Sequence, residues 1–114
     1  MARDPRAYLW DVREAGQAIQ SFVRGMDAAA FACDVLVQAA VERKFEVIGE
    51  ALNQLAKVDP ALAARVPDVA HIVAFRNQLI HGYARVRPQT VWHIAATALP
   101  GLMVAVQTLL QELE

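Results

Sequence analysis

The chain has 114 residues, a formal net charge of −1 at pH 7 and a hydrophobic fraction of 56%. This length predicts one domain over residues 1–114, and 20% charged residues exclude a disordered or polybasic chain. Alanine and leucine are abundant and runs of β-branched residues are short, so the composition predicts an all-α fold. The high apolar content also favours a homodimer, in which a second copy covers part of the surface.

The first helix is predicted over roughly residues 5–24. Asp4 suits an N-cap, and Pro5 suits the first helical position. Apolar residues then recur at spacings of three and four as far as Phe22, which is the pattern of one helix face. Gly25 is a plausible end of this helix.

A second, longer helix is predicted from Asp27, which suits its N-cap, to about Lys57. Two polar residues, Gln38 and Glu42, interrupt its apolar stripe. Gly49 lies in its interior, where glycine costs about 1 kcal/mol relative to alanine. One interpretation is that another helix, which could belong to a second copy of the chain, approaches closely at Gly49. The other is that the residue is simply tolerated among alanines.

The second half of the chain predicts a short helical turn over 60–66, a helix from 69 to near Gly82 and a last helix that begins at Gln89. Pro100-Gly101 lies inside the last helix and must kink it or split it in two. Together these elements predict an antiparallel bundle of four to five helices.

Several features bear on the compartment. Cys33 is the only cysteine, which excludes an intrachain disulfide and favours a reducing compartment. We expect it to be a buried small apolar residue. The N-terminus is polar, which indicates no signal peptide, and the weakly polar stretch 94–106 is expected to be too short and too broken to span a bilayer. The chain is therefore predicted to be cytoplasmic, without a membrane partner.

The charges are distributed unevenly. Residues 1–68 carry eight Lys/Arg and ten Asp/Glu, whereas residues 69–111 carry three arginines, three histidines and no carboxylate side chain. Such an acid-free segment suits an anion such as phosphate. The alternative is that these arginines are merely solvated.

The segment 75–83 (Phe-Arg-Asn-Gln-Leu-Ile-His-Gly-Tyr) holds the residues best suited to chemistry. Arg76 can bind phosphate through two parallel hydrogen bonds, and His81 can act as a general base because histidine is the side chain best suited to proton transfer near neutral pH. Five residues separate them by about 140° on an ideal helix, so they converge poorly unless two copies of the chain pool them. Each also has a structural interpretation: His81 as a helix-end cation, Arg76 in a salt bridge with Glu42 or Glu46, and Tyr83 as a loop anchor.

The spacing Arg-x-x-x-x-His-x-Tyr resembles the HepT-like branch of the HEPN superfamily, whose members are small helical toxins of prokaryotic toxin–antitoxin pairs. The segment 45–51 (Phe-Glu-Val-Ile-Gly-Glu-Ala) is similar to the family's Ile-Gly-Glu-Ala segment, and Val91-Trp92 and Leu99-Pro100 also match. The resemblance covers about residues 8–110. One departure is Pro67-Asp68, where many members have Pro-Trp, and we expect it to affect helix capping more than chemistry.

The resemblance implies a metal-independent endoribonuclease that works as a homodimer with the two motifs facing each other across a cleft. His81 would take the proton of the ribose 2′-OH, Arg76 would stabilise the phosphorane, and Asn77 would orient the phosphate or the histidine. Arg85 and Arg87 are candidates for binding substrate phosphates. Glu46 and Glu50 either orient Arg76 or His81 or form a solvated acidic face. No cofactor or metal is expected, because the three histidines lack zinc-like spacing.

The resemblance also implies a partner, a minimal nucleotidyltransferase that acts as the antitoxin. In some pairs the antitoxin transfers AMP to the motif tyrosine, and Tyr83 is the matching position. A bulky anion there would keep RNA out of the site by charge and volume. The alternative function is a non-catalytic helical module that docks the nucleotidyltransferase.

Overall fold

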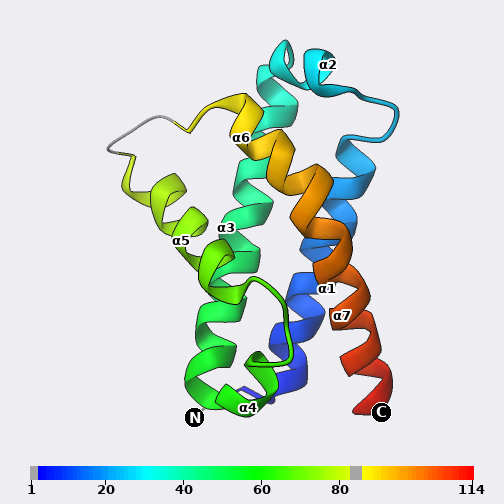
Figure 1. Ribbon diagram of the computed structural model, residues 1–114, viewed down its shortest axis with the longest axis vertical. Coiled ribbons are helices and arrows are strands. Elements are labelled where there is room, and N and C mark those ends of the chain that lie inside the picture. The colour runs from blue at the N-terminus through cyan, green and yellow to red at the C-terminus, as the bar shows by residue number, and fades with distance from the viewer. Residues whose placement is uncertain (1–2, 83–85) are drawn as a thin grey trace.

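The computed structural model describes residues 3–82 and 86–114 and confirms the all-α bundle. Its elements are α1 (Pro5–Phe22), α2 (Ala28–Ala32), α3 (Val35–Val58), α4 (Pro60–Ala63), α5 (Val69–His81), α6 (Pro88–His93), a π-helical turn (Ile94–Ala98) and α7 (Leu99–Glu112). The bundle measures 40 × 31 × 20 Å, and both ends of the chain lie at its lower end in Figure 1.

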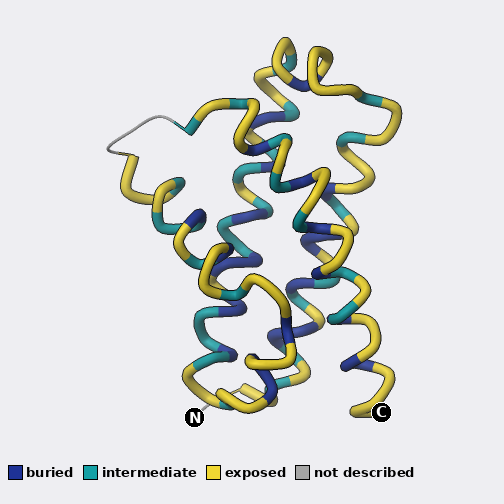
Figure 2. The backbone as a smooth tube through the Cα atoms, in the orientation of Figure 1, coloured by how far each residue is buried: buried dark blue, intermediate teal, exposed yellow. Residues whose placement is uncertain are grey.

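Helices α1 and α3 form the most extensive helix pair, and they carry the other helices on their flanks. Helix α5 packs on α3, and α7 packs on α1, so α5 and α7 lie on opposite sides of the bundle (Figure 1). Buried residues face inward along each of these helices (Figure 2). Phe45 of α3 meets Phe75 of α5 edge to face, with ring centroids 5.4 Å apart, which places the α3–α5 contact in the core.

The prediction of one helix from Asp27 to Lys57 is wrong at a single point. The chain breaks at Cys33 and Asp34 and starts again as α3, because the Asp34 side chain accepts a hydrogen bond from the Val37 N–H. The Gln38 amide donates to the carbonyls of Phe31 (2.8 Å) and Ala32 (3.1 Å), which end α2. This explains the buried polar residue on the apolar stripe. Cys33 lies at this corner and is exposed, contrary to the expectation of burial.

The last predicted helix continues through Pro100 by means of the π turn that precedes it. The N–H of Leu99 bonds to the carbonyl of Ile94, five residues earlier, and the Thr97 hydroxyl donates to the carbonyl of His93 at 2.6 Å. These bonds accommodate a proline, which has no N–H to give. The expected interruption is therefore a wider turn within one continuous run from Pro88 to Glu112.

The length of this run differs from the expectation that the apolar stretch 94–106 is too short and too broken to span a bilayer. Pro88–Glu112 has 25 residues and a mean hydropathy of 1.5, and it is the one helix in the described ranges long and apolar enough for a span. The criterion uses length and composition only, and core helices of soluble proteins also meet it. In this bundle the helix packs on α1 through buried residues such as Leu102 and Val106.

Candidate active site

Arg76 lies on the side of α5 that faces α3, with 23% of its side chain exposed. Directly opposite is Gly49, buried in α3. A Cβ added at Gly49 would lie 2.6 Å from Cγ of Arg76 and closer still to its Cβ. Gly49 therefore marks a close helix approach, as one of the two interpretations predicted, and the approaching helix belongs to the same chain.

Two neighbours hold the Arg76 guanidinium. Its Nη2 donates to a carboxylate oxygen of Glu50, and its Nη1 donates to Oδ1 of Asn77 at 2.8 Å. The other Glu50 oxygen accepts from the amide of Gln54 at 3.1 Å. Because Glu50 is about half exposed, we assign the ion pair only about 0–1 kcal/mol of stability. Its main effect is to orient Arg76.

The Arg76 guanidinium retains hydrogen-bonding capacity at its outer end. An arginine has five N–H donors, and the contacts with Asn77 and Glu50 engage one hydrogen on each of its two terminal nitrogens, Nη1 and Nη2. Its Nε is buried and has no hydrogen-bond partner among the described residues. The side chain is thus held in place without being saturated, which leaves donors for an anionic ligand.

Arg76 opens onto a cleft of about 550 Å³ between α1, α3 and α5. Its charged lining residues are three arginines and three carboxylates, Arg3, Arg43, Arg76, Asp11, Glu46 and Glu50. Arg3 pairs with Asp11 at 2.8 Å, and this bond raises the pKa of the arginine. The positive and negative charges of the lining are therefore equal in number, and the charge of Arg76 is offset by that of Glu50.

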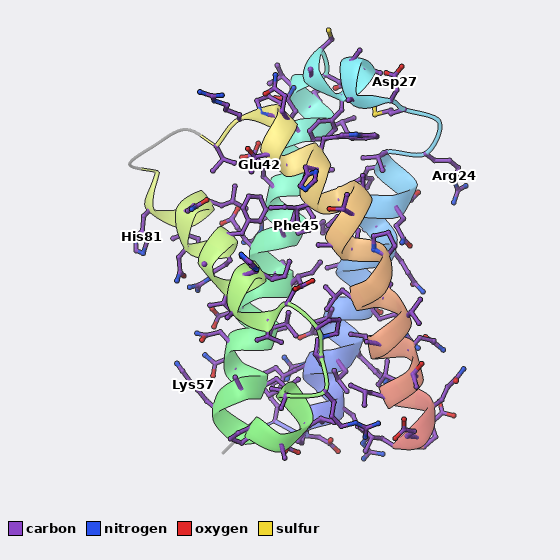
Figure 3. All side chains as sticks on the ribbon, viewed as in Figure 1. Arg24, Asp27, Glu42, Phe45, Lys57 and His81 are labelled. Carbon is purple, nitrogen blue, oxygen red and sulfur yellow. The ribbon has the colours of Figure 1, made fainter. Side chains whose placement is uncertain are left out.

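His81 is the last residue of α5 and is exposed. It lies at the outer end of that helix, which points away from the rest of the bundle (Figure 3). Gly82, with φ of 64°, ends the helix directly after it. His81 is not among the residues that line the Arg76 cleft. The two motif residues therefore do not converge within one chain, in agreement with their 140° separation.

The other predicted site residues are only partly brought together. Glu50, rather than Glu42 or Glu46, is the ion-pair partner of Arg76, and Glu46 lines the same cleft without that contact. Asn77 contacts the arginine. Arg87 precedes α6 and is exposed. Tyr83 and Arg85 lie outside the described residues.

Sequence reasoning did not single out Gln54 or the α1 wall of the cleft. The four-residue spacing of Glu50 and Gln54 is a signal for their contact. The contribution of Arg3 and Asp11 depends on how α1 crosses α3, which no local pattern reveals. The described part of the chain holds no group of three or more His, Cys, Asp or Glu side chains suited to a metal ion.

Comparisons with known proteins give the family of the chain. The family model described as "Ribonuclease HepT-like" matches residues 12–109. A protein of Thermococcus cleftensis named "Probable ribonuclease HepT" is 32% identical over 102 residues, which cover 90% of this chain and 92% of that protein. A candidate RNase of Methanocaldococcus jannaschii is 30% identical over 112 residues, or 98% of this chain and 92% of the relative.

A candidate RNase of Caldanaerobacter subterraneus is 29% identical over 110 residues, 96% of this chain and 97% of the relative. No solved structure matches the chain. The matched range holds both the Gly49–Glu50 pair and the Arg76–His81 spacing. The chain belongs to the HepT-like ribonuclease family.

Proposed function

We propose that this chain is a metal-independent endoribonuclease that acts as the toxin of a toxin–antitoxin pair in the cytoplasm. The observation that carries the proposal is the arrangement of Arg76 in a HepT-like chain. Arg76 packs against Gly49, is held by Glu50 and Asn77, and precedes His81 by five positions on the same helix. In cleavage of RNA by its own 2′-OH, an exposed imidazole can serve as the general base and an oriented arginine can stabilise the developing charge.

The proposed reaction starts with His81, which takes the proton of a ribose 2′-OH. The 2′ oxygen attacks the adjacent phosphorus, and the bond to the 5′ oxygen of the next nucleotide breaks as that oxygen takes a proton from solvent water. The products are a 2′,3′-cyclic phosphate and a free 5′-OH. Arg76 stabilises the charge that builds on the phosphorane, through the Nη1 and Nη2 hydrogens that Asn77 and Glu50 leave unused.

The proposal includes a homodimer, because one chain does not bring Arg76 and His81 to the same cleft. Between these two residues on α5 is Ile80, which is 45% exposed and lines the same cleft as Arg76. An apolar residue beside the motif suits contact with a second copy, whose His81 would complete the site. Light scattering at tens of micromolar should give twice the chain mass. A strictly monomeric protein that still cleaves RNA would contradict this part of the proposal.

Cleavage assays on purified protein test the chemistry. His81→Ala and Arg76→Ala should each lower the cleavage rate by about 10²–10⁴ without unfolding the bundle. EDTA should have no effect, and the products should carry 2′,3′-cyclic phosphate ends. Cleavage that persists in His81→Ala, or that stops with EDTA, would exclude this mechanism.

We further propose a minimal nucleotidyltransferase as the antitoxin, with Tyr83 as the residue that receives AMP. Transfer to the tyrosine hydroxyl releases pyrophosphate from ATP and leaves a nucleotide anion beside the motif. Co-expression with such a partner should add AMP masses to the Tyr83 peptide, and Tyr83→Phe should remove them. An unmodified peptide in the neutralised complex would assign neutralisation to direct binding.

A second function, a non-catalytic module that docks the nucleotidyltransferase, is favoured by the balanced charge of the Arg76 cleft. Tight nucleic-acid binding usually shows a more basic surface. The two functions differ in one measurement. A docking module binds the partner equally well with or without His81 and cleaves no RNA, whereas the endoribonuclease loses its toxicity with His81→Ala.

A further inference from the structure

A second cavity, of about 390 Å³, lies between α5 and the run formed by α6 and the π turn. It opens on a different side of α5 from the Arg76 cleft and shares none of its lining residues. Its polar lining comes from both walls: Asp68, His71, Gln78, Thr90, His93 and Thr97. Its size falls at the small end of the range for small-molecule sites, about 300–1,000 Å³.

The interior of this cavity suits a flat heteroaromatic ring. Phe75 and Ile94 provide apolar lining, and the imidazole of His93 lines the same cavity. The Gln78 amide and the Thr90 hydroxyl each provide both donor and acceptor groups. Unstacked RNA bases are recognised by this combination of aromatic faces and amide or hydroxyl contacts to their edges.

The cavity lies close enough to His81 to receive part of a substrate bound there. Gln78 precedes His81 by three residues on α5, and side chains at that spacing are neighbours on a helix surface. A nucleotide whose ribose lies at His81 would therefore reach the cavity with its base. The one carboxylate of the lining, Asp68, lies ten residues from Gln78, about 15 Å along the helix axis. It is thus far from the phosphates at the motif.

Both backbone irregularities of this region border the same cavity. Asp68 has a φ of 60°, the one positive value for a non-glycine residue among those described, and it makes no side-chain cap bond to α5. The π turn at Ile94–Ala98 forms part of the opposite wall. Strained residues and π turns concentrate at binding sites, because they widen a helix or redirect it where a ligand must fit.

We propose that this cavity is a base-binding subsite, which receives the base of the nucleotide on the 5′ side of the scissile phosphate and sets a base preference. The inference rests on the proposed ribonuclease function. Gln78 and His93 are its specificity-determining residues, and neither takes part in the bond-breaking step.

The cleavage arm of the test uses short RNAs that differ only in that base. Wild type should discriminate among the four bases by about 5- to 150-fold in kcat/KM, the range for one good base contact. Gln78→Ala and His93→Ala should flatten the preference. The matched control is Gln107→Ala, an exposed glutamine on α7 outside both cavities, which should retain it. Variants that cleave with the wild-type preference would overturn the subsite but not the ribonuclease.

The binding arm needs no catalysis, so it separates failure of the subsite from failure of the ribonuclease. Nucleoside 3′-monophosphates should shift the imidazole NMR signals of His71 and His93, and inorganic phosphate should not. Equal shifts with phosphate, or none with any nucleotide, would overturn the proposal. The proposal would also be overturned if 5′-AMP binds but Gln78→Ala and His93→Ala keep the wild-type base preference in cleavage. The occupant of the cavity would then be a free nucleotide.

Discussion

The contact of Gly49 with Arg76 supports a quantitative prediction about Gly49→Ala. The added methyl would lie 2.6 Å from Cγ of Arg76, whereas ordinary carbon contacts are about 3.5–4.0 Å. Relief requires α5 to move away from α3 by about 1 Å, since the clash involves atoms next to the α5 backbone. A shift of that size in a catalytic group costs about 10²-fold in rate.

The effect of Gly49→Ala on stability should be smaller than its effect on rate. Alanine gains about 1 kcal/mol over glycine in a helix interior, and overpacking costs about 1–3 kcal/mol. The net loss in the free energy of unfolding should therefore be about 0–2 kcal/mol, which leaves the protein folded. Urea unfolding and RNA cleavage measured on the same preparation separate the two effects.

Two other glycines provide matched controls. A Cβ at Gly101 meets nothing within 4 Å, so Gly101→Ala should stabilise by up to about 1 kcal/mol and leave cleavage unchanged. A Cβ at Gly16 would overlap the thioether of Met103, the flexible end of a side chain that can turn aside. Gly16→Ala should therefore retain cleavage too. Wild-type cleavage in Gly49→Ala would refute the claim that this contact positions Arg76.

Three further predictions concern other contacts. Gln38→Ala removes the donor to two carbonyls at the α2–α3 corner and should cost about 1–3 kcal/mol in urea unfolding, whereas the exposed Gln17→Ala should cost under about 0.5. Glu50→Gln should change stability by under about 1 kcal/mol yet lower kcat, with a KM for RNA that does not rise; an unchanged kcat would mean that Glu50 does not orient Arg76. The hydrogen bonds from Arg6 lower the pKa of Asp4 from 3.8 to about 2, so the stability that this cap gives α1 is present above pH 4 and is lost as pH falls to about 2. NMR of the first turn of α1 should follow that pH range in wild type and not in Asp4→Asn.

Most helix bounds follow from local sequence signals, and the break before α3 shows why one does not. Asp4-Pro5 and Asp59-Pro60 mark a helix start and a helix end by chemistry that acts within a few residues. The break at Asp34 has no glycine or proline to announce it. Besides the Asp34 cap, it depends on a hydrogen bond from Gln38 to α2, which exists only once the corner has folded.

In the candidate site, too, some features can be predicted from the sequence and others depend on the fold. The residue types and spacing of Arg76 and His81 are visible in the sequence, and so is the unusual glycine at position 49. The partner of Arg76 is not, because Glu42, Glu46 and Glu50 follow one another at single-turn intervals along α3. Which of them meets the arginine depends on where α5 crosses, and that crossing is set by core contacts such as Phe45 with Phe75.

The π turn at Ile94–Ala98 fixes the phase between the two halves of a long helix. Val91, Ala95 and Leu99 are all buried at spacings of four, which in an unbroken α-helix advance by about 40° per step around the axis. A π turn holds one residue more than an α-helical turn, so deleting one residue from it leaves Leu102, Val106 and Leu109 in phase with α1. A deletion in α7 between the turn and Leu102 would instead rotate those residues by about 100° and move them off α1. A deletion in the 24–26 connection after α1 alters no helix phase. Among functional variants of this chain, one-residue deletions should therefore be tolerated at that connection and within the turn, and rejected in α7 just beyond it.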